Sequence, residues 1–112
     1  MIEVTLKNYV STELAPIPVY MEEPEDKPEK YVLISYQGTG EDNYLYTGMV
    51  TAKSYAPSLY EASLLNEQVK EVLDSLIEVN EITSSKLNAS YPFNETTTKR
   101  YRYQCVFNII HY

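Results

Sequence analysis

One apolar stripe behind a helix-start signal limits the folds open to this chain more than any other feature. Ser58 and Glu61 have the spacing of a capping box, which satisfies backbone donors at the start of a helix. Apolar residues then recur at three- and four-residue spacing, at Leu59, Ala62, Leu65, Val69, Val72, Leu73 and Leu76. The solvated side carries Glu67, Lys70, Glu71 and Asp74. Because such a helix must bury one face, we expect it to pack on a sheet.

The segments on both sides of this helix have the composition and alternation of β-strands. Residues 31–36 and 44–55 are separated by turn-forming residues at 38–43, which predicts a hairpin with Gly48 as a candidate bulge. Later in the chain, Leu87, Ala89, Tyr91 and Phe93 recur at every second position, and Pro92 favours an edge strand. Residues 94–98 then turn the chain into the clearest strand, in which residues 101–109 alternate between apolar and mixed positions.

The first thirty residues predict a short helix, a short strand and a loop. Apolar residues at helical spacing mark the helix, at Ile2, Leu6, Tyr9 or Val10, and Leu14. Pro16 and Pro18 end it, so Val19 and Tyr20 begin a short edge strand that leads into an acidic, proline-containing loop at 21–30. The chain is therefore predicted to be a single α+β domain over residues 1–112. We expect a mostly antiparallel sheet of about four strands, with the long helix packed on one face and a short N-terminal helix.

Length and charge restrict the classes of function. A chain of 112 residues suits one domain, and its 16 acidic against nine basic residues give a formal net charge of −7, which disfavours binding to a phosphate backbone. The single cysteine cannot form a disulfide within the chain, and we expect an intracellular protein without a signal segment. No apolar run approaches the roughly 18 residues of a membrane helix, so no bilayer span is expected.

No pattern of reactive residues predicts catalysis. His111 lacks a cysteine or an acid at triad or metal-ligand spacing, and Cys105 falls among the apolar positions of the last strand. Gly38 and Gly40 lack the third glycine and the context of a dinucleotide fingerprint, so they are expected at a hairpin tip. We therefore expect a protein that is not an enzyme, with no catalytic residue and no cofactor.

The charged clusters and the glycosylation patterns of the sequence do not predict a binding or modification site. The carboxylates of the loop at 21–30 lack the spacing of a calcium loop, so no metal site is expected and solvation is the simpler reading. The basic residues at 99–102 form one short patch on an acidic chain and are read as a strand start with outward charges. Asn88 and Asn94 match the glycosylation pattern only by chance.

Tyrosine is the residue type in excess, with 12 tyrosines against two phenylalanines and no tryptophan. Its apolar body and polar tip suit surfaces that are wet in the monomer and covered in a complex, although sheets favour tyrosine in any case. Tyrosines of the second hairpin arm cannot all share one side of a straight strand, so both sheet faces are expected to carry apolar groups. We expect a neighbouring subunit to cover the second face or an edge of the sheet. The predicted partner-binding residues are Glu22, Glu23, Glu25, Asp26, Tyr44, Tyr46 and Tyr55.

The order of elements, the helix-opening segment at 54–62 and the closing segment at 101–107 together resemble a known family over essentially the whole chain. The family is that of the tail terminator, or tail-completion, proteins of long-tailed phages and prophages. The resemblance implies a virion structural protein at the head-tail junction, assembled in the host cytoplasm. The resemblance implies a six-fold ring that caps the tail tube, stops its polymerisation and provides the head-attachment surface.

The same resemblance implies the partners. They are copies of the chain itself, the tail tube protein, a head-completion or connector protein, and double-stranded DNA as it passes through the lumen, with no membrane. Subunits would meet largely through the sheet, and loops would project toward the lumen or the tube; the hairpin tip at 38–43 and the loop at 21–30 are the candidates. A head closure or stopper protein, another connector component, and a small cellular α+β binding module remain as alternatives.

Overall fold

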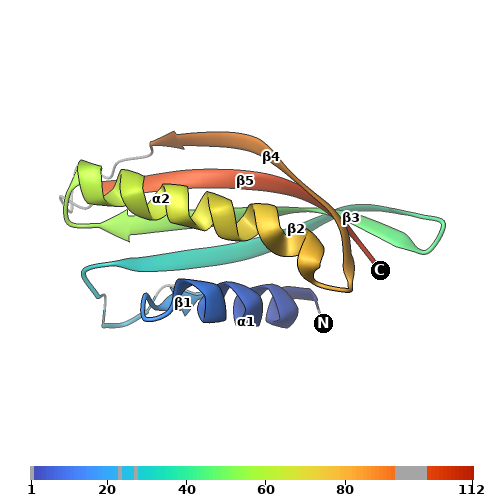
Figure 1. Ribbon diagram of the computed structural model, residues 1–112, viewed down its shortest axis with the longest axis horizontal. Helices are drawn as coiled ribbons and strands as arrows, with labels where there is room; N and C mark the ends of the chain where they lie inside the picture. The colour runs from blue at the N-terminus through green and yellow to red at the C-terminus, as the bar shows by residue number, and fades with distance from the viewer. Residues whose placement is uncertain (1, 23, 27, 93–100) are drawn as a thin grey trace.

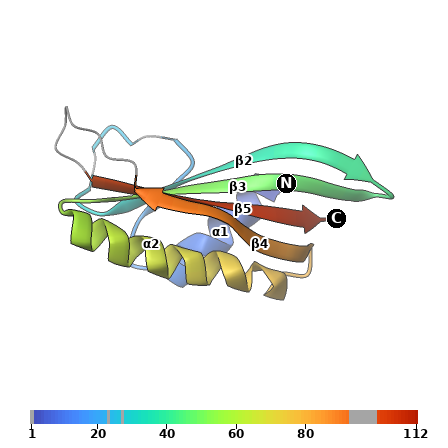
Figure 2. The same cartoon turned by 90° about the horizontal axis from the view of Figure 1, so that it is seen from above.

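Two helices pack on one face of a five-stranded sheet in the computed structural model (Figures 1 and 2). The structure describes residues 2–22, 24–26, 28–92 and 101–112. Along the chain the elements are α1 (Ile2–Leu14), β1 (Val19–Tyr20), β2 (Tyr31–Asp42), β3 (Leu45–Ala56), α2 (Leu59–Asp74), the 3₁₀ helix η1 (Ser75–Glu78), β4 (Ile82–Pro92) and β5 (Tyr101–His111).

The sheet has the strand order β1-β2-β3-β5-β4. Only β1 runs parallel to its neighbour, and the other three pairings are antiparallel. This arrangement confirms the predicted α+β class, the two hairpin pairings and the edge position of the strand that contains Pro92. The sheet has five strands rather than about four, because the short segment predicted at Val19 and Tyr20 pairs with β2.

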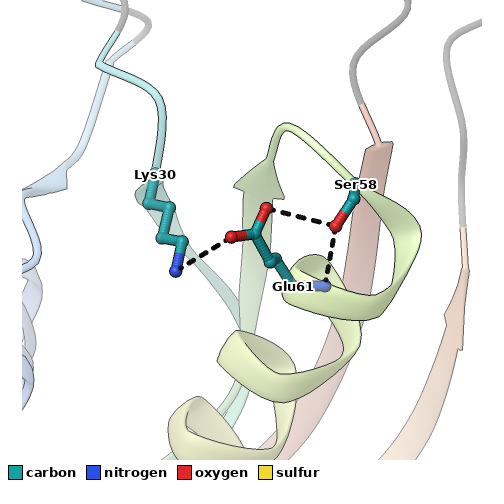
Figure 3. A network of polar contacts seen from close by, with 3 residues as sticks. All are labelled: Lys30, Ser58 and Glu61. Carbon is teal, nitrogen blue, oxygen red and sulfur yellow. Dashed lines mark hydrogen bonds and ion pairs between the residues drawn. The ribbon is translucent and has the colours of Figure 1, made fainter.

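The start of α2 forms one of the two backbone bonds of the predicted capping box, because the Glu61 carboxylate bonds the Ser58 hydroxyl rather than the Ser58 backbone N–H (Figure 3). The backbone N–H of Glu61 donates to Oγ of Ser58 at 3.2 Å, and the Ser58 hydroxyl donates to the Glu61 carboxylate at 3.1 Å. The other carboxylate oxygen of Glu61 lies 3.6 Å from Nζ of Lys30, which comes directly before β2. One glutamate therefore fixes the helix start and connects it to the beginning of the neighbouring strand.

The core lies between the helices and one face of the sheet. Leu6, Val10 and Leu14 of α1 are buried there as the sequence predicts. From the long helix and the sheet, the core adds Leu65, Val69, Leu73, Leu76, Val19, Val32, Ile34, Val50, Ala52, Ile82, Cys105, Phe107 and Ile109. Leu59 is an exception to the predicted stripe, because it lies in the first turn of α2 and is 43% exposed.

The tip of the β2–β3 hairpin differs from the prediction. β2 continues through the glycines to Asp42, and the turn lies at Asn43 and Tyr44, whose φ angles are 50° and 68°. Two consecutive positive φ values are those of a two-residue type I′ turn, which joins antiparallel strands without splaying them. The register shift lies on β2, between Gly38 and Gly40, so the predicted bulge at Gly48 is wrong.

The strand before β5 is also longer than predicted. β4 begins at Ile82, and register shifts interrupt its pairing with β5 at two places, one of them between Leu87 and Ala89. These two residues therefore lie on opposite faces, although their spacing in the sequence suggests a shared one. Phe93 and the turn predicted at 94–98 lie outside the described residues.

Candidate interaction surfaces

Both helices lie on one side of the sheet, and no helix of the described residues covers the other side (Figure 2). Strand alternation and register define this helix-free face. Apart from one end, where tyrosines cluster around Tyr31 and Tyr55, its side chains include Leu33, Ser35, Gln37, Thr47, Met49, Thr51, Lys53, Ser84, Lys86, Ala89, Gln104, Val106, Asn108 and Ile110. Leu33, Met49 and Ile110 keep part of their apolar surface in contact with solvent. The face is therefore neither a packed core nor a fully polar surface.

Charge is distributed unevenly between this face and the rest of the molecule. The described strands contain three cations, Lys53, Lys86 and Arg102, and the register places all three on the helix-free side. The only strand carboxylates are Glu41 and Asp42, at the hairpin tip. Away from the hairpin tip, the charged residues that the described strands place on the helix-free face are therefore all cations, and the remaining described carboxylates lie on helices and in connecting segments.

A small hollow lies on the helix-free face beside Lys86. It has a volume of about 300 Å³, and its polar lining comes from β2, β3, β4 and β5, with Thr39, Thr47, Ser84, Lys86 and Asn108. The hydroxyl of Thr39 donates to that of Thr47 at 2.9 Å. One ammonium group and several hydroxyl and amide donors suit the carboxylate of another molecule.

Three tyrosines and an arginine cover one end of the same face. The rings of Tyr31 and Tyr55 are stacked with centroids 4.5 Å apart, and Tyr20 meets Tyr31 edge-on at 6.1 Å. The guanidinium of Arg102 donates to the Tyr55 hydroxyl at 2.9 Å and lies 5.6 Å from the centre of its ring. Because Tyr31 is fully buried and Tyr55 is 4% exposed, these contacts fill the end of the face within one subunit.

The predicted partner-binding residues do not form one surface. Glu22, Glu25 and Asp26 are exposed in the segment between β1 and β2, which Figure 2 shows on the side of the sheet away from the helices. Glu23 lies outside the described residues.

The three predicted tyrosines are also separated. Tyr44 is 89% exposed in the hairpin turn, and Tyr46 is 43% exposed on the helix side of β3. Tyr55 lies on the opposite face and packs within its own subunit, so its ring offers little surface for the partner contact predicted for it. As the sequence indicates, Tyr46 and Tyr55 do not share one side of the strand.

A second, separate site lies on the helix side, where α1 begins and β5 ends. Nε2 of His111 is 2.7 Å from the Tyr36 hydroxyl, and its Nδ1 is 3.0 Å from the main-chain oxygen of Tyr112. Tyr46 stacks on the imidazole with ring centres 5.6 Å apart. A hollow of about 480 Å³ adjoins these rings, and its lining also includes Ile2, Glu3, Gly38, Glu81 and Tyr112. We call it the Tyr36 hollow.

Cys105, Gly38 and Gly40, which the sequence analysis considered for chemistry, lie in positions that serve the fold. Cys105 is fully buried in the core, and burial raises the pKa of its thiol to about 12, which favours the protonated form. Gly38 and Gly40 lie in strand β2 rather than at the hairpin tip. Among the described residues, no three His, Cys, Asp or Glu side chains form a group that could hold a metal ion. Neither helix of the described chain is long and apolar enough to cross a membrane.

Sequence reasoning missed Lys53 and Lys86 as surface determinants, and it missed Tyr36, Glu3 and Glu81 as neighbours of His111. Lys53 lies in a predicted strand, whereas Lys86 comes directly before the predicted start of the next one, so the available signal was weak. Their common face is set by the pairing of β3 and β4 with β5, which brings Lys53 opposite Gln104 and Lys86 opposite Asn108. The Tyr36 hollow brings together residues from both ends of the chain, and spacing alone cannot indicate that.

Comparison with known proteins gives no further constraint: a scan of family models finds no match to this chain, and a search of curated proteins finds none either.

Proposed function

We propose that this chain is a virion structural protein, a tail terminator that forms a ring on the end of a tail tube and stops its growth. The observation that carries the proposal is the helix-free face, which combines partly exposed apolar side chains with lysines and is left without a helical cover. Such a face suits an interface with another protein, because burying it excludes water from Leu33, Met49 and Ile110.

The charge distribution supports a second copy of the chain as one partner. Exposed carboxylates on α2, at Glu67, Glu71 and Asp74, have the sign that Lys53 and Lys86 attract. The two surfaces lie on opposite sides of the subunit, because α2 covers the other face of the sheet (Figure 2). A contact between them joins unlike patches, and head-to-tail contacts of this kind close into rings when the rotation allows.

Two elements are available for contacts with the tube or the lumen. The β2–β3 hairpin ends in the exposed Tyr44, and the segment between β1 and β2 carries Glu22, Glu25 and Asp26. Carboxylates that line a lumen repel a DNA backbone and would keep it from adhering during passage. Reversing the charges of Glu22, Glu23, Glu25 and Asp26 should slow DNA release and lower infectivity. Unchanged release and infectivity would contradict the proposal that these carboxylates line the lumen.

The decisive experiment mixes the protein with purified tail tube subunits and measures tube length by electron microscopy. A terminator gives short tubes whose length falls as the ratio of this chain to tube subunit rises. Unaffected tubes would contradict the proposal. Binding to portal or adaptor subunits instead would identify a stopper protein, which is the nearest alternative. The isolated chain need not assemble, because a ring that forms only on the tube end is stabilised by binding there.

A further inference from the structure

We propose that the Tyr36 hollow binds a guanidinium group, such as that of an arginine side chain. The inference is independent of the proposed function, because it depends only on the chemistry of the hollow. Its volume of about 480 Å³ lies within the range of small-ligand sites. Its lining combines aromatic rings with carboxylates, at Glu3, Tyr36, Tyr46, Glu81, His111 and Tyr112.

The aromatic wall is held in place before any ligand arrives. The main-chain oxygen of Tyr112 can only accept a hydrogen bond, so Nδ1 of His111 carries the proton that it shares at 3.0 Å. In the neutral imidazole, Nε2 then accepts from the Tyr36 hydroxyl at 2.7 Å. Tyr46 packs on this fixed imidazole at an interplanar angle of 23° and remains 43% exposed. The stacked rings of Tyr46 and His111 therefore border the hollow, and part of Tyr46 is open to solvent.

The carboxylates of Glu3 and Glu81 give the hollow the negative charge that a cationic ligand needs. Neither Glu3 nor Glu81 has an ion-pair partner among the residues that the structure describes. Burial, and after it the negative charge of Glu3, raises the pKa of the Tyr36 hydroxyl, which places the Glu3 charge close enough to act on that ring. The hollow therefore has negative potential without a cation of the described chain to neutralise it.

A guanidinium matches both features better than the alternatives. Its plane stacks on an aromatic face, while its N–H donors reach carboxylate oxygens in the same plane. An alkylammonium ion offers a point charge without the flat stacking surface, and an anion would be repelled. A neutral apolar ligand would leave two carboxylates desolvated and unpaired, which disfavours its binding.

The test titrates the full chain with N-acetyl-arginine amide and follows the backbone amides of Gly38, His111 and Tyr112 by nuclear magnetic resonance. The uncharged isostere N-acetyl-citrulline amide serves as the first control, and N-acetyl-lysine amide tests a point charge. We expect a dissociation constant on the order of 1 mM for the arginine compound, as suits one partly exposed side chain. The citrulline compound should bind at least about tenfold more weakly, and the lysine compound should fall between them.

Two matched variants distinguish binding at the hollow from a general effect of the net charge of the chain. Glu3→Gln should weaken arginine binding by about threefold to tenfold, whereas Glu13→Gln, with the same charge change on the same helix, should leave it unaltered. Tyr46→Leu should weaken binding while the thermal unfolding curve shows that the variant is folded. Equal binding of arginine and citrulline compounds, equal effects of the two glutamate variants, or no saturation below roughly 10 mM would overturn the proposal.

A final arm separates a free ligand from a protein side chain as the source of the guanidinium. A peptide with one central arginine should bind more tightly than the free amide if the site recognises a partner protein, because flanking residues add contacts. Equal affinities would assign the site to a free guanidinium compound, which supports the same chemistry from the other source.

Discussion

The Tyr36 side chain crosses a whole strand to reach His111: its hydroxyl lies 2.7 Å from Nε2 of the histidine, although β3 runs between β2 and β5. The path is open because Gly48 of β3 has no side chain, and the Tyr36 ring occupies the space above it. One tyrosine thereby connects three strands near the base of the projecting hairpin.

Removal of the Tyr36 hydroxyl should destabilise the fold. Tyr36→Phe leaves Nε2 of the buried His111 without its donor, which costs about 1–2 kcal/mol in the free energy of unfolding. Urea denaturation measures this loss. Tyr60→Phe removes a hydroxyl from a side chain that is 73% exposed and should change stability little, so equal losses in the two variants would contradict the role given to Tyr36.

A methyl group at Gly48 should disturb the same contact. Its Cβ would overlap the ring of Tyr36, and we expect Gly48→Ala to cost about 1–3 kcal/mol. At Gly38, the residue of β2 that pairs with Gly48, an added Cβ meets nothing closer than 3.9 Å, so Gly38→Ala should be tolerated. If overlap with Tyr36 is the cause, combining Gly48→Ala with Tyr36→Ala should cost less than the two single losses added together.

The helix cap gives a third measurable effect. Ser58→Ala removes the acceptor for the N–H of Glu61 and should lower the free energy of unfolding by about 1 kcal/mol. Lys30→Met removes only an exposed ion pair to Glu61 and should change stability by less than about 1 kcal/mol. A larger loss of unfolding free energy in Lys30→Met than in Ser58→Ala would contradict the view that the Ser58 cap contributes more than the ion pair.

Alkaline pH should destabilise the chain through Cys105. Burial raises the pKa of its thiol from 9.0 to about 12, so the folded state retains a proton that the unfolded state loses between these values. Stability from this group is complete below pH 9 and falls as pH rises toward 12. Between pH 8 and 10, wild-type protein should lose about 1 kcal/mol more than Cys105→Ala, measured by urea denaturation. Parallel losses would show that the thiol does not contribute.

The sequence predicts elements well where one local signal decides them. α2 follows from the box of Ser58 and Glu61 and from its apolar stripe, and β5 follows from its alternation. Gly38 and Gly40 favour a turn by composition, but they lie within β2, so the hairpin tip comes later than predicted. Gly48, a predicted bulge, is instead small because the ring of Tyr36 packs over it, a reason that only the fold supplies. Asn43 was a usable turn signal, but Tyr44 is a rare residue at positive φ.

The candidate surfaces were less predictable than the elements. The alternation of Leu87 and Ala89 in the sequence predicts a shared face, but a register shift between them places them on opposite faces. Lys53 and Lys86 lie on one face because β3 and β4 both pair with β5, and no local pattern in the sequence indicates this. Tyr36 and His111 are 75 residues apart, so no local pattern connects them. The exposed Tyr46 and the buried Tyr55 have similar sequence surroundings, and only the packing of neighbouring rings separates them.

The central claim is that a second copy of the chain covers the lysine-bearing, helix-free face when the ring forms on a tube. Lys86→Glu tests it most directly, because Lys86 is exposed beside the hollow on that face. Lys7→Glu, with the same charge change on α1, is the control. In tube-growth assays, wild type and Lys7→Glu should halt elongation, while Lys86→Glu should leave tubes long. Equal capping by Lys86→Glu and wild type would contradict the account.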